Sequence, residues 1–375
     1  MLWFFFSFIC LISAFLGEKR FSSSYLFFRI ILILALSLFA GLGGIVSTDH
    51  DNYAQIFRTI TKYDLASIFK LSSFNPFSDK DNTEAGYLLL NWIIHKLGFS
   101  EPMFFIIISI IMNTLVVNII YRYKYPVFSV LLFIVSTSYF QETNIVRQML
   151  AAYIFLYAVK FLENRQPLQY ILTVMLASTF HTSALVLIPF VVFAYLDLSK
   201  YSKIVTAVLL ALCFFSLVVM QGIISLEVLD NLSSITYYDI YTNNLEGIGH
   251  EENPFELEYN VIVIFVLIFL FFSKTKKSNS FYLRLTIITI GLFFSNIAIP
   301  YYWFYRIAMY FVPLYYFFIP EIMSKISFRN SKRDHSSVTI PLCVIVLWNL
   351  LDLIRNFILN KNVVLGSKFY PLSSL

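Results

Sequence analysis

Charged residues are scarce in this chain, and their scarcity sets the class of protein. Only 13% of the 375 residues are Asp, Glu, Lys or Arg, whereas 59% are hydrophobic, and the mean hydropathy is +0.75. A soluble domain carries about 25% charged residues, so this chain has too few of them to cover a surface that faces water. The composition therefore predicts an integral membrane protein and excludes an ordinary soluble enzyme.

Several other features are missing. The cysteines Cys10, Cys213 and Cys343 lie far apart in apolar stretches, which indicates packing residues and not a metal motif. There is no Gly-Lys-Ser phosphate loop, zinc-ligand spacing or Gly-x-Ser-x-Gly elbow. No basic run is interleaved with aromatic residues in a polar segment, so we expect no nucleic-acid partner. No polar segment is large enough for a nucleotide-binding domain, and we expect no direct use of ATP and no cofactor.

Long apolar stretches are what the chain has in abundance. A spanning helix needs roughly 17 to 25 such residues. The candidates, some of them short, lie near 2–17, 25–46, 103–121, 126–140, 146–162, 168–180, 183–197, 203–221, 259–273, 282–299, 302–320 and 338–354. The sequence therefore predicts an all-α polytopic membrane protein with about twelve transmembrane helices, forming a single integral membrane domain over 1–375. The first stretch has its positive charge after it, which favours a span over a cleaved signal peptide.

The positions of Lys and Arg predict the orientation. When the chain is threaded through these spans, every basic loop falls on one side, which is cytoplasmic by the positive-inside rule. The termini and two long segments, 47–102 and 222–258, then face outward and form periplasmic loops. Within the first segment, the apolar stretch Tyr87–Leu97 is too short to span the bilayer. We expect it to form an interfacial or re-entrant helix.

Ionisable residues gather at the outward ends of the spans, and each is a functional candidate because charge is costly at a membrane. Arg147 is expected in the first turn of the helix over 146–162, after a cap at Thr143 or Asn144. A guanidinium at a helix N-terminus suits a phosphate, although Arg147 could instead be an interfacial anchor. Arg306 lies within the 302–320 span, where an aromatic belt does not account for a cation.

His181, Glu84 and the pair Asp49 and Asp51 are further candidates on the same face. His181, at the outward turn between two spans, could be a general base, a phosphate donor or a structural histidine. Glu84 starts the interfacial helix, either as a partner of the helix dipole or as a base or sugar ligand. Asp49 and Asp51 have the spacing of a divalent-metal pair, but this pattern often arises by chance, and we expect no metal.

These segments together resemble the EpsG family of bacterial polysaccharide polymerases, which is related in role to the Wzy O-antigen polymerases. The resemblance runs from about residue 47 to residue 320 and includes the short segments Arg147-Gln148-x-x-Ala151 and Phe180-His181-x-Ser183. The other matching pieces are Asp49-x-x-x-Tyr53, Glu84-x-Gly86-Tyr87 and Arg306-x-x-x-Tyr310 with Pro313.

The resemblance implies a GT-C-like fold and a metal-independent glycosyltransferase in the bacterial inner membrane, with a periplasmic active face. Its donor and acceptor would be oligosaccharide repeat units on undecaprenyl pyrophosphate. A hydroxyl of one repeat would attack the anomeric carbon of the growing glycan, and undecaprenyl pyrophosphate would leave. Membrane lipid and a chain-length regulator protein are the other partners that the resemblance allows for.

The resemblance also suggests a role for each candidate. Arg147 and Arg306 would bind the leaving pyrophosphate, while His181, Glu84 or Asp49 would position or deprotonate the acceptor. We expect Arg147 and His181 to line one outward-facing cavity. The further substrate-binding candidates are Gln148, Tyr53, Arg58 and Tyr310, with Tyr237 and Tyr241 as sugar-stacking rings in the large outer loop.

Other readings of the sequence remain open. An O-antigen ligase, or another undecaprenol-dependent glycosyltransferase, would use the same donor with a different acceptor. A transporter or flippase for lipid-linked oligosaccharides should carry charges deep within several spans, whereas the mid-span stretches here have almost none. A membrane acyltransferase would need a His deep in the membrane or a His-Asp pair, which the sequence does not show.

Overall fold

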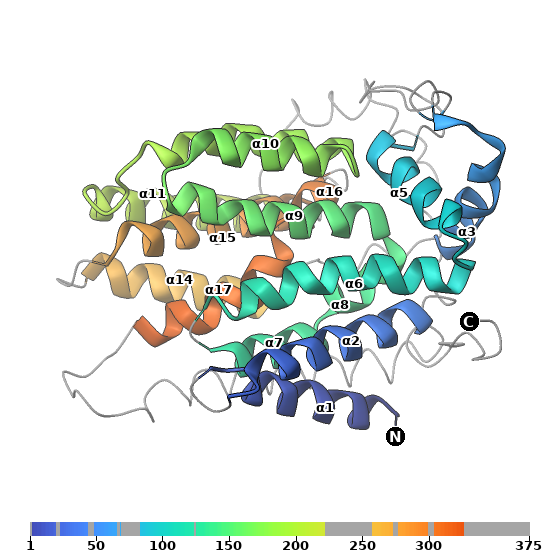
Figure 1. Cartoon of the computed structure of the whole chain (residues 1–375). Coiled ribbons are helices and arrows are strands. Elements are labelled where there is room, and N and C mark those ends of the chain that lie inside the picture. The colour runs from blue at the N-terminus through green and yellow to red at the C-terminus, as the bar shows by residue number, and fades with distance from the viewer. Residues whose placement is uncertain are drawn as a thin grey trace. The chain divides into compact units, whose positions relative to one another are not determined.

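The computed structural model describes residues 2–19, 23–43, 49–65, 68, 83–123, 125–221, 257–272, 277–298 and 304–325. These residues are almost entirely helical, and no strand occurs among them, which confirms the all-α prediction (Figure 1). The chain divides into two compact units. Unit 1 comprises Met1–Ser73, Thr83–Tyr153 and Tyr316–Leu375, and unit 2 comprises Phe74–Asn82 and Ile154–Tyr315.

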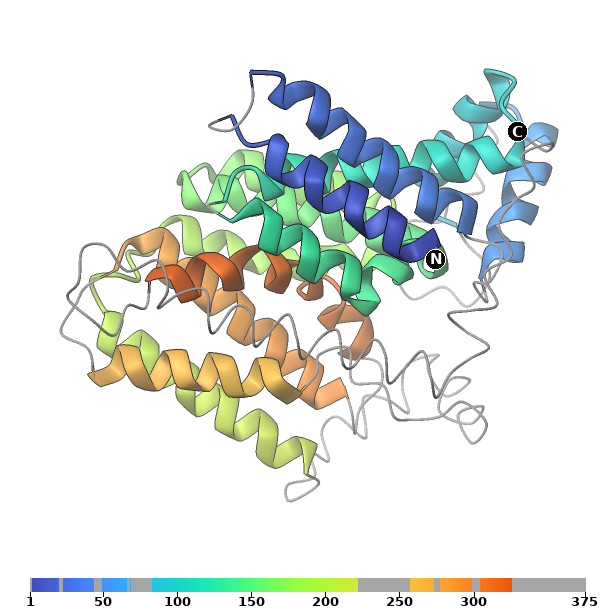
Figure 2. The same ribbon diagram turned by 90° about the horizontal axis from the view of Figure 1, so that it is seen from below.

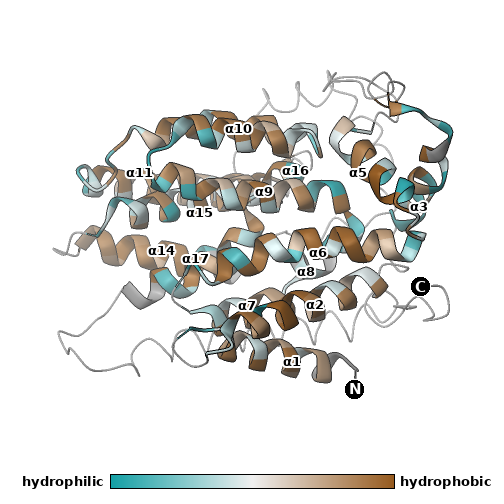
Figure 3. Ribbon diagram, in the orientation of Figure 1, coloured by the Kyte–Doolittle hydropathy of each residue, from teal (hydrophilic) through white to brown (hydrophobic). Residues whose placement is uncertain are grey.

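Four helices are long and apolar enough to cross a membrane: α2 (Tyr25–Gly43), α6 (Glu101–Ile120), α11 (Ser202–Met220) and α15 (Asn279–Ala298). Apolar residues dominate these helices (Figure 3). The chain is therefore a membrane protein by composition and helix length, whereas the count of about twelve spans stays a prediction. The span expected at 338–354 lies outside the described residues. Shorter apolar helices are α1 (Leu2–Leu16), α7 (Pro126–Val135), α10 (Pro167–Ser178), the 3₁₀ helix η3 (Thr182–Ala194), α14 (Leu257–Phe272) and α17 (Val312–Lys325).

Two of the expected spans are not continuous helices. The stretch 126–140 contains α7 and the start of α8 (Thr137–Asn144), which are separated by Ser136 in an extended conformation with φ −83° and ψ 153°. The stretch 302–320 contains the short helix α16 (Phe304–Ala308), a turn and the first part of α17. Hydropathy did not reveal these breaks, because residues 309–311 are themselves apolar and the short polar run 136–138 is followed at once by Tyr139 and Phe140.

Unit 1 is built on closely packed helices. α2 lies along α6 and α1 (Figure 1), and α1 and α6 also pack on α7. A Cβ atom on Gly41 of α2 would lie 2.7 Å from the Ile106 Cα atom of α6, so glycine permits the close approach of the two backbones. The buried Tyr139 hydroxyl of α8 donates a hydrogen bond of 2.7 Å to the Leu36 carbonyl of α2. Packing and this polar contact together fix α8 against α2.

The segment of unit 1 that was predicted to face outward contains two helices. α3 (His50–Thr59) leads through a 3₁₀ turn at Ile60–Lys62 to a chain segment outside the described residues, after which α5 (Ala85–Lys96) follows. Ile60 of the 3₁₀ turn, Ile68 and Leu88 of α5 form a buried cluster, and Ile56 of α3 packs against it. The helix predicted from Tyr87–Leu97 is thus present as α5, whereas α3 was not predicted.

Unit 2 contains the second set of packed helices. α15 packs on α11, α14 and α16 (Figure 2), and α10 pairs with η3. Asn296 of α15 donates hydrogen bonds to Asn260 of α14 (2.8 Å) and to Ser216 of α11 (2.9 Å), so these polar groups are satisfied although they are buried. As a 3₁₀ helix rises about 2.0 Å per residue, the 13 residues of η3 extend about 26 Å. That length approaches the apolar thickness of a bilayer, about 30 Å.

Contacts within each unit join residues that the predicted threading puts on the same side of the membrane. In unit 1, Arg29 near the N-terminus of α2 donates to the Gly17 carbonyl at 2.9 Å. In unit 2, Arg284 of α15 is 2.6 Å from Glu163. Both residues of each pair belong to predicted cytoplasmic ends. The alternation of the spans is therefore consistent with the packing, although the packing does not identify which side is cytoplasmic.

Candidate functional site

The first group of candidates lies in unit 1, at the start of α9 (Val146–Glu163). Arg147 is the second residue of this helix, as predicted, and its Nη1 atom is 2.5 Å from Oε2 of Glu84. Glu84 is the residue before α5 and does not cap that helix with its side chain. Its carboxylate therefore pairs with Arg147, which lies 63 positions further along the chain, and does not cap α5.

The exposure of this ion pair is asymmetric. The Glu84 side chain is 10% exposed, whereas the Arg147 side chain is 29% exposed. The Arg147 Nε atom is buried and has no hydrogen-bond partner among the described residues. One edge of the guanidinium is thus held by the protein while part of the group still reaches the surface. Such an arginine can contact an additional anion through its remaining N–H groups.

Tyr53 of α3 completes the surroundings of Arg147. Burial raises the pKa of the Tyr53 hydroxyl, while the Arg147 guanidinium, by its charge and by a hydrogen bond, acts in the opposite direction. The Tyr53 ring meets Tyr87 of α5 edge-on, with the ring centroids 5.8 Å apart. Asp49 is close enough to act on the Tyr53 hydroxyl electrostatically. The structure therefore brings together Asp49, Tyr53, Glu84 and Arg147, four of the predicted site residues.

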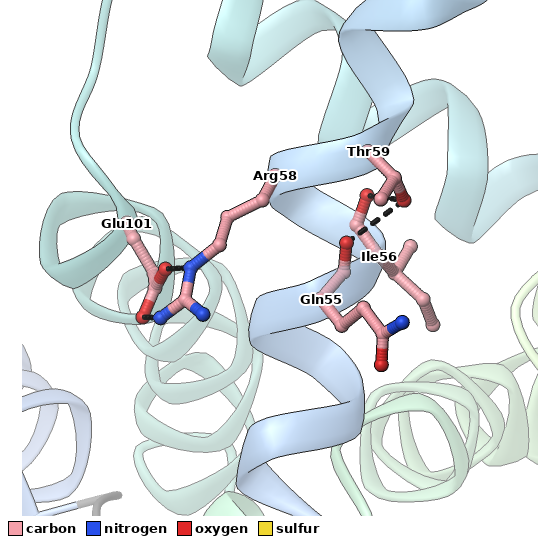
Figure 4. Close-up of polar contacts among 5 residues, drawn as sticks. All are labelled: Gln55, Ile56, Arg58, Thr59 and Glu101. Atoms are coloured by element: carbon pink, nitrogen blue, oxygen red, sulfur yellow. Dashed lines mark hydrogen bonds and ion pairs between the residues drawn. The ribbon is translucent and has the colours of Figure 1, made fainter.

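Arg58 lies on the same helix as Tyr53 but has a different partner. Its Nε and Nη2 atoms face the two carboxylate oxygens of Glu101, the first residue of α6, and the Nη2–Oε1 distance is 2.9 Å (Figure 4). Figure 4 also shows the Thr59 hydroxyl donating to the carbonyls of Gln55 and Ile56. The ion pair links α3 to α6, and the substrate-binding role predicted for Arg58 stays a prediction.

Unit 2 holds the second group of candidates. His181 is the residue before η3, and its extended backbone makes the tight turn after α10 that the sequence predicts. Two positions on, the Ser183 hydroxyl lies 2.9 Å from the hydroxyl of Tyr310. Tyr310 is fully buried and follows α16, which carries Arg306 and packs on η3. Two sequence segments 127 positions apart are thereby joined.

The remaining predictions have different outcomes. Gln148 is buried, at 6% exposure, beside Arg147 in the first turn of α9. Arg306 is in the short helix α16 and is partly exposed, so it is not inside a continuous span. Tyr237 and Tyr241 lie outside the described residues. Arg147 belongs to unit 1 and His181 to unit 2, so a cavity shared by the two stays a prediction.

Asp49 and Asp51 are the two carboxylates whose spacing in the sequence resembles a divalent-metal pair. Asp49 directly precedes α3 and Asp51 lies in its first turn. Within the described part of the chain, no group of three or more His, Cys, Asp or Glu side chains is placed to hold a metal ion.

One buried acid was missed by the sequence analysis. Glu142 of α8 is 1% exposed and accepts hydrogen bonds from Tyr153 and Asn113. Thr143 and Asn144, expected as caps of the next helix, are the last residues of α8, and Ile145 directly precedes α9. The available signal was the polar run Gln141–Asn144 between two apolar stretches, which is too short to distinguish a loop from a short helix.

Comparison with known proteins agrees with the resemblance of the motifs. No curated protein and no solved structure matches this chain significantly. The family model described as the EpsG family matches residues 26–373, which include every candidate residue described above. This chain therefore belongs to the EpsG family, whose members are Wzy-type polysaccharide polymerases.

Proposed function

We propose that this chain joins oligosaccharide repeat units carried on undecaprenyl pyrophosphate, at the periplasmic face of the bacterial inner membrane. Family membership supports a membrane-bound polysaccharide polymerase of the glycosyltransferase type. The observation that carries the finer proposal is the Glu84–Arg147 pair, which holds a partly exposed guanidinium in the first turn of α9. A helix N-terminus and a guanidinium together favour a phosphate ligand.

The chemistry requires stabilisation of a leaving group. The acceptor hydroxyl oxygen forms a bond to the anomeric carbon, and the bond from that carbon to the pyrophosphate oxygen breaks. The electron pair of the broken bond goes to undecaprenyl pyrophosphate, and the hydroxyl proton passes to a base or to water. Arg147 donates hydrogen bonds to the phosphate oxygens, where negative charge increases in the transition state.

Glu84 contributes to this step by orienting Arg147. The Glu84 carboxylate lies 2.5 Å from the Arg147 Nη1 atom. This contact restricts the orientations of the guanidinium and favours the one that binds the pyrophosphate. In this proposal Glu84 is a positioning residue. His181 and Asp49 remain the candidates for deprotonating or orienting the acceptor hydroxyl, and Arg306 is the candidate for a second contact to pyrophosphate.

The proposed reaction uses arginine in place of a metal. Pyrophosphate is a good leaving group, and charge-assisted hydrogen bonds from arginine neutralise phosphate efficiently. We expect EDTA to leave the activity of the purified protein largely unchanged. Loss of activity on chelation, with recovery in Mg²⁺ or Mn²⁺, would instead make Asp49 and Asp51 the first candidates for metal ligands.

The direct test is to incubate the purified full chain, in lipid nanodiscs, with one defined undecaprenyl-pyrophosphate-linked repeat unit. A polymerase should give a ladder of longer glycans and one released undecaprenyl pyrophosphate for each bond formed. Arg147→Ala, prepared in the same way, is the negative control. The ladder and the released lipid can be measured by mass spectrometry.

The same assay separates the alternatives. A ligase would form no ladder and would transfer glycan only when a separate glycolipid acceptor is added. A flippase would form no bond but would move the lipid-linked repeat across a vesicle membrane. In a deletion strain, single repeat units on the lipid core would agree with a polymerase, whereas accumulation of untransferred lipid-linked polymer would indicate a ligase.

A further inference from the structure

Glu142 is a buried carboxyl group to which the proposed reaction gives no role. Its side chain is 1% exposed. The Tyr153 hydroxyl lies 2.7 Å from Oε1, and the Asn113 Nδ2 atom lies 3.1 Å from Oε2. These three side chains come from α8, α9 and α6, so one carboxyl group connects three helices of unit 1.

The surroundings of Glu142 favour its neutral form. Both side chains that hydrogen-bond it are uncharged, and burying an unpaired carboxylate is costly. Burial raises the pKa of the Glu142 carboxyl to about 8, although the hydrogen bonds from Tyr153 and Asn113 act in the opposite direction. Glu142 is therefore mainly protonated at pH 7.

A neutral carboxyl group fits this set of partners. One oxygen accepts the hydrogen bond from Asn113, and the protonated oxygen can donate to the Tyr153 hydroxyl across the same 2.7 Å contact. A glutamine side chain presents the same arrangement, with a carbonyl toward Asn113 and an N–H group toward Tyr153. Glu142→Gln is thus a close mimic of the neutral acid.

The titratable neighbours of Glu142 are few. Tyr139 of α8 and Tyr153 of α9 interact with it electrostatically, Cys10 of α1 acts on Tyr139, and Tyr316 of α17 acts on Tyr153. The packed helices α6, α2 and α7 carry no titratable side chain over 102–120, 30–43 and 126–135. Among the residues that the structure describes, no Lys, Arg or His belongs to this set, so ionisation of Glu142 would place a charge there that none of these neighbours compensates.

A hydrogen bond of Glu142 also crosses the break between α8 and α9, which lies just before Arg147. α8 ends at Asn144 and α9 begins at Val146, and Ile145 between them has the non-helical angles φ −116° and ψ 53°. Glu142 lies before this break and Tyr153 after it. The Glu142–Tyr153 hydrogen bond therefore joins the two helices across the break, and the hydrogen bond from Asn113 connects them to α6. These two hydrogen bonds are called the joint below.

We propose that Glu142 is a positioning residue that holds the first turn of α9, and hence Arg147, in the orientation that meets the pyrophosphate. This inference rests on the proposed function of Arg147 and adds to it a residue with no contact to the substrate. Loss of the joint lets α9 rotate relative to α8. A displacement of about 1 Å at a reacting group can cost about 10²-fold in rate.

The experiment compares Glu142→Ala, Glu142→Gln and wild type as full-length proteins in nanodiscs. Tyr121→Phe is the control, because it removes a different hydrogen-bonding group of unit 1, the Tyr121 hydroxyl that donates to the Ala14 carbonyl at 2.9 Å. We expect Glu142→Ala to lower kcat by about 10²-fold and Glu142→Gln to restore it at pH 7. Tyr121→Phe should keep the wild-type kcat.

The pH profile gives the sharper readout. Ionisation of Glu142 above a pH of about 8 should lower wild-type kcat, whereas Glu142→Gln has no proton to lose and should lack this decline. The same decline in both proteins would overturn the proposal. So would a Glu142→Gln variant that accumulates normally but is as inactive as Glu142→Ala.

Binding of inorganic pyrophosphate, measured by calorimetry, separates this inference from the proposed function. We expect affinity to fall in Arg147→Ala and in Glu142→Ala and to be retained in Glu142→Gln. If wild type forms no polymer but shows this pattern of affinities, the proposed function fails and the positioning role stands. If wild type polymerises and the Glu142 variants match it in both kcat and affinity, only the positioning role fails.

Discussion

At the scale of single residues, the Arg147 guanidinium is bound by the protein on one side and partly exposed on another. Nη1 is 2.5 Å from Glu84, and the side chain is 29% exposed. An arginine that only anchored its helix at the membrane interface would not need a buried carboxylate from another helix. The pair therefore fits a guanidinium that is oriented for a ligand better than one that snorkels to the bilayer surface.

Replacing Arg147 by lysine tests this distinction. We expect Arg147→Lys to lose about 10²-fold in polymerisation rate, because one ammonium group cannot serve Glu84 and two phosphate oxygens in the planar geometry of a guanidinium. Arg147→Ala should be inactive while the protein still inserts and accumulates. The rate of glycan ladder formation measures both. A fully active Arg147→Lys protein would show that Arg147 is only an interfacial anchor.

Exchanging the two charges separates stability from ligand binding. Arg147→Glu alone should reduce accumulation, because it places two carboxylates against each other at a partly buried site. Adding Glu84→Arg restores an ion pair of opposite polarity and should recover accumulation but not activity, since the cation is then no longer on α9. Quantitative immunoblotting of membranes and the polymerisation assay provide the two readouts. Recovery of activity in the exchanged protein would show that the pair has only a structural role.

At the scale of helices, close backbone contacts stabilise unit 1. Gly41 of α2 approaches Ile106 of α6 so closely that a Cβ atom would lie 2.7 Å from the Ile106 Cα atom. Dispersion and close packing hold membrane helices together, because lipid is as apolar as their side chains. A larger residue at this position must separate the two helices, which removes contacts along their length.

We therefore expect Gly41→Val to destabilise the protein by about 1–3 kcal/mol, the usual cost of overpacking. Leu38→Phe is the control, because it enlarges a side chain on the same helix at a position that is 43% exposed. Thermal unfolding in detergent should show a lower midpoint for Gly41→Val and little change for Leu38→Phe. Equal midpoints for Gly41→Val and wild type would contradict the tight packing of α2 on α6.

Helix boundaries were only partly predictable at this scale. The helix starting near Arg147 and the helix following Glu84 were predicted from the sequence, because charge and apolar length are local properties. The cap expected at Thr143 or Asn144 was wrong, because both residues belong to α8. The break at Ser136 was not predicted. Ser136 lies in a run that is apolar up to Val135 and polar from Thr137 to Ser138, and only packing determines whether such a run bends.

At the scale of the whole molecule, the placement of Lys and Arg predicts the orientation in the membrane. The loop 274–281 and the segment 325–337 should be cytoplasmic, and 222–258 should be periplasmic. This prediction matters for function, because it places the Glu84–Arg147 pair and the turn at His181 on the outward side, where lipid-linked repeats would be joined.

Single cysteines at Thr275 and Asn243 test the orientation. A membrane-impermeant maleimide added to intact cells with a permeabilised outer membrane should label Asn243→Cys and leave Thr275→Cys unlabelled. Both should react after the inner membrane is disrupted, which controls for access to each thiol. Labelling of Thr275→Cys alone in intact cells would reverse the orientation and move the proposed active face to the cytoplasm.

The sequence by itself determined the class of protein, most of the helices and the family. It also located Arg147 in the first turn of a helix. These properties are additive along the chain, because the free energy of transferring a segment to the bilayer is close to a sum over its own residues. For the same reason, the scarcity of charge identified Arg147, His181 and Glu84 as functional candidates before any contact was known.

Only the tertiary structure decided which side chains form hydrogen bonds or ion pairs with one another. Glu84 meets Arg147 across 63 positions, Ser183 meets Tyr310 across 127, and Glu142 forms its joint with Tyr153 and Asn113. Nothing local distinguishes Glu84 as the partner of an arginine, or Glu142 as a neutral acid. Those roles depend on which helices pack together and on how completely packing removes each group from water.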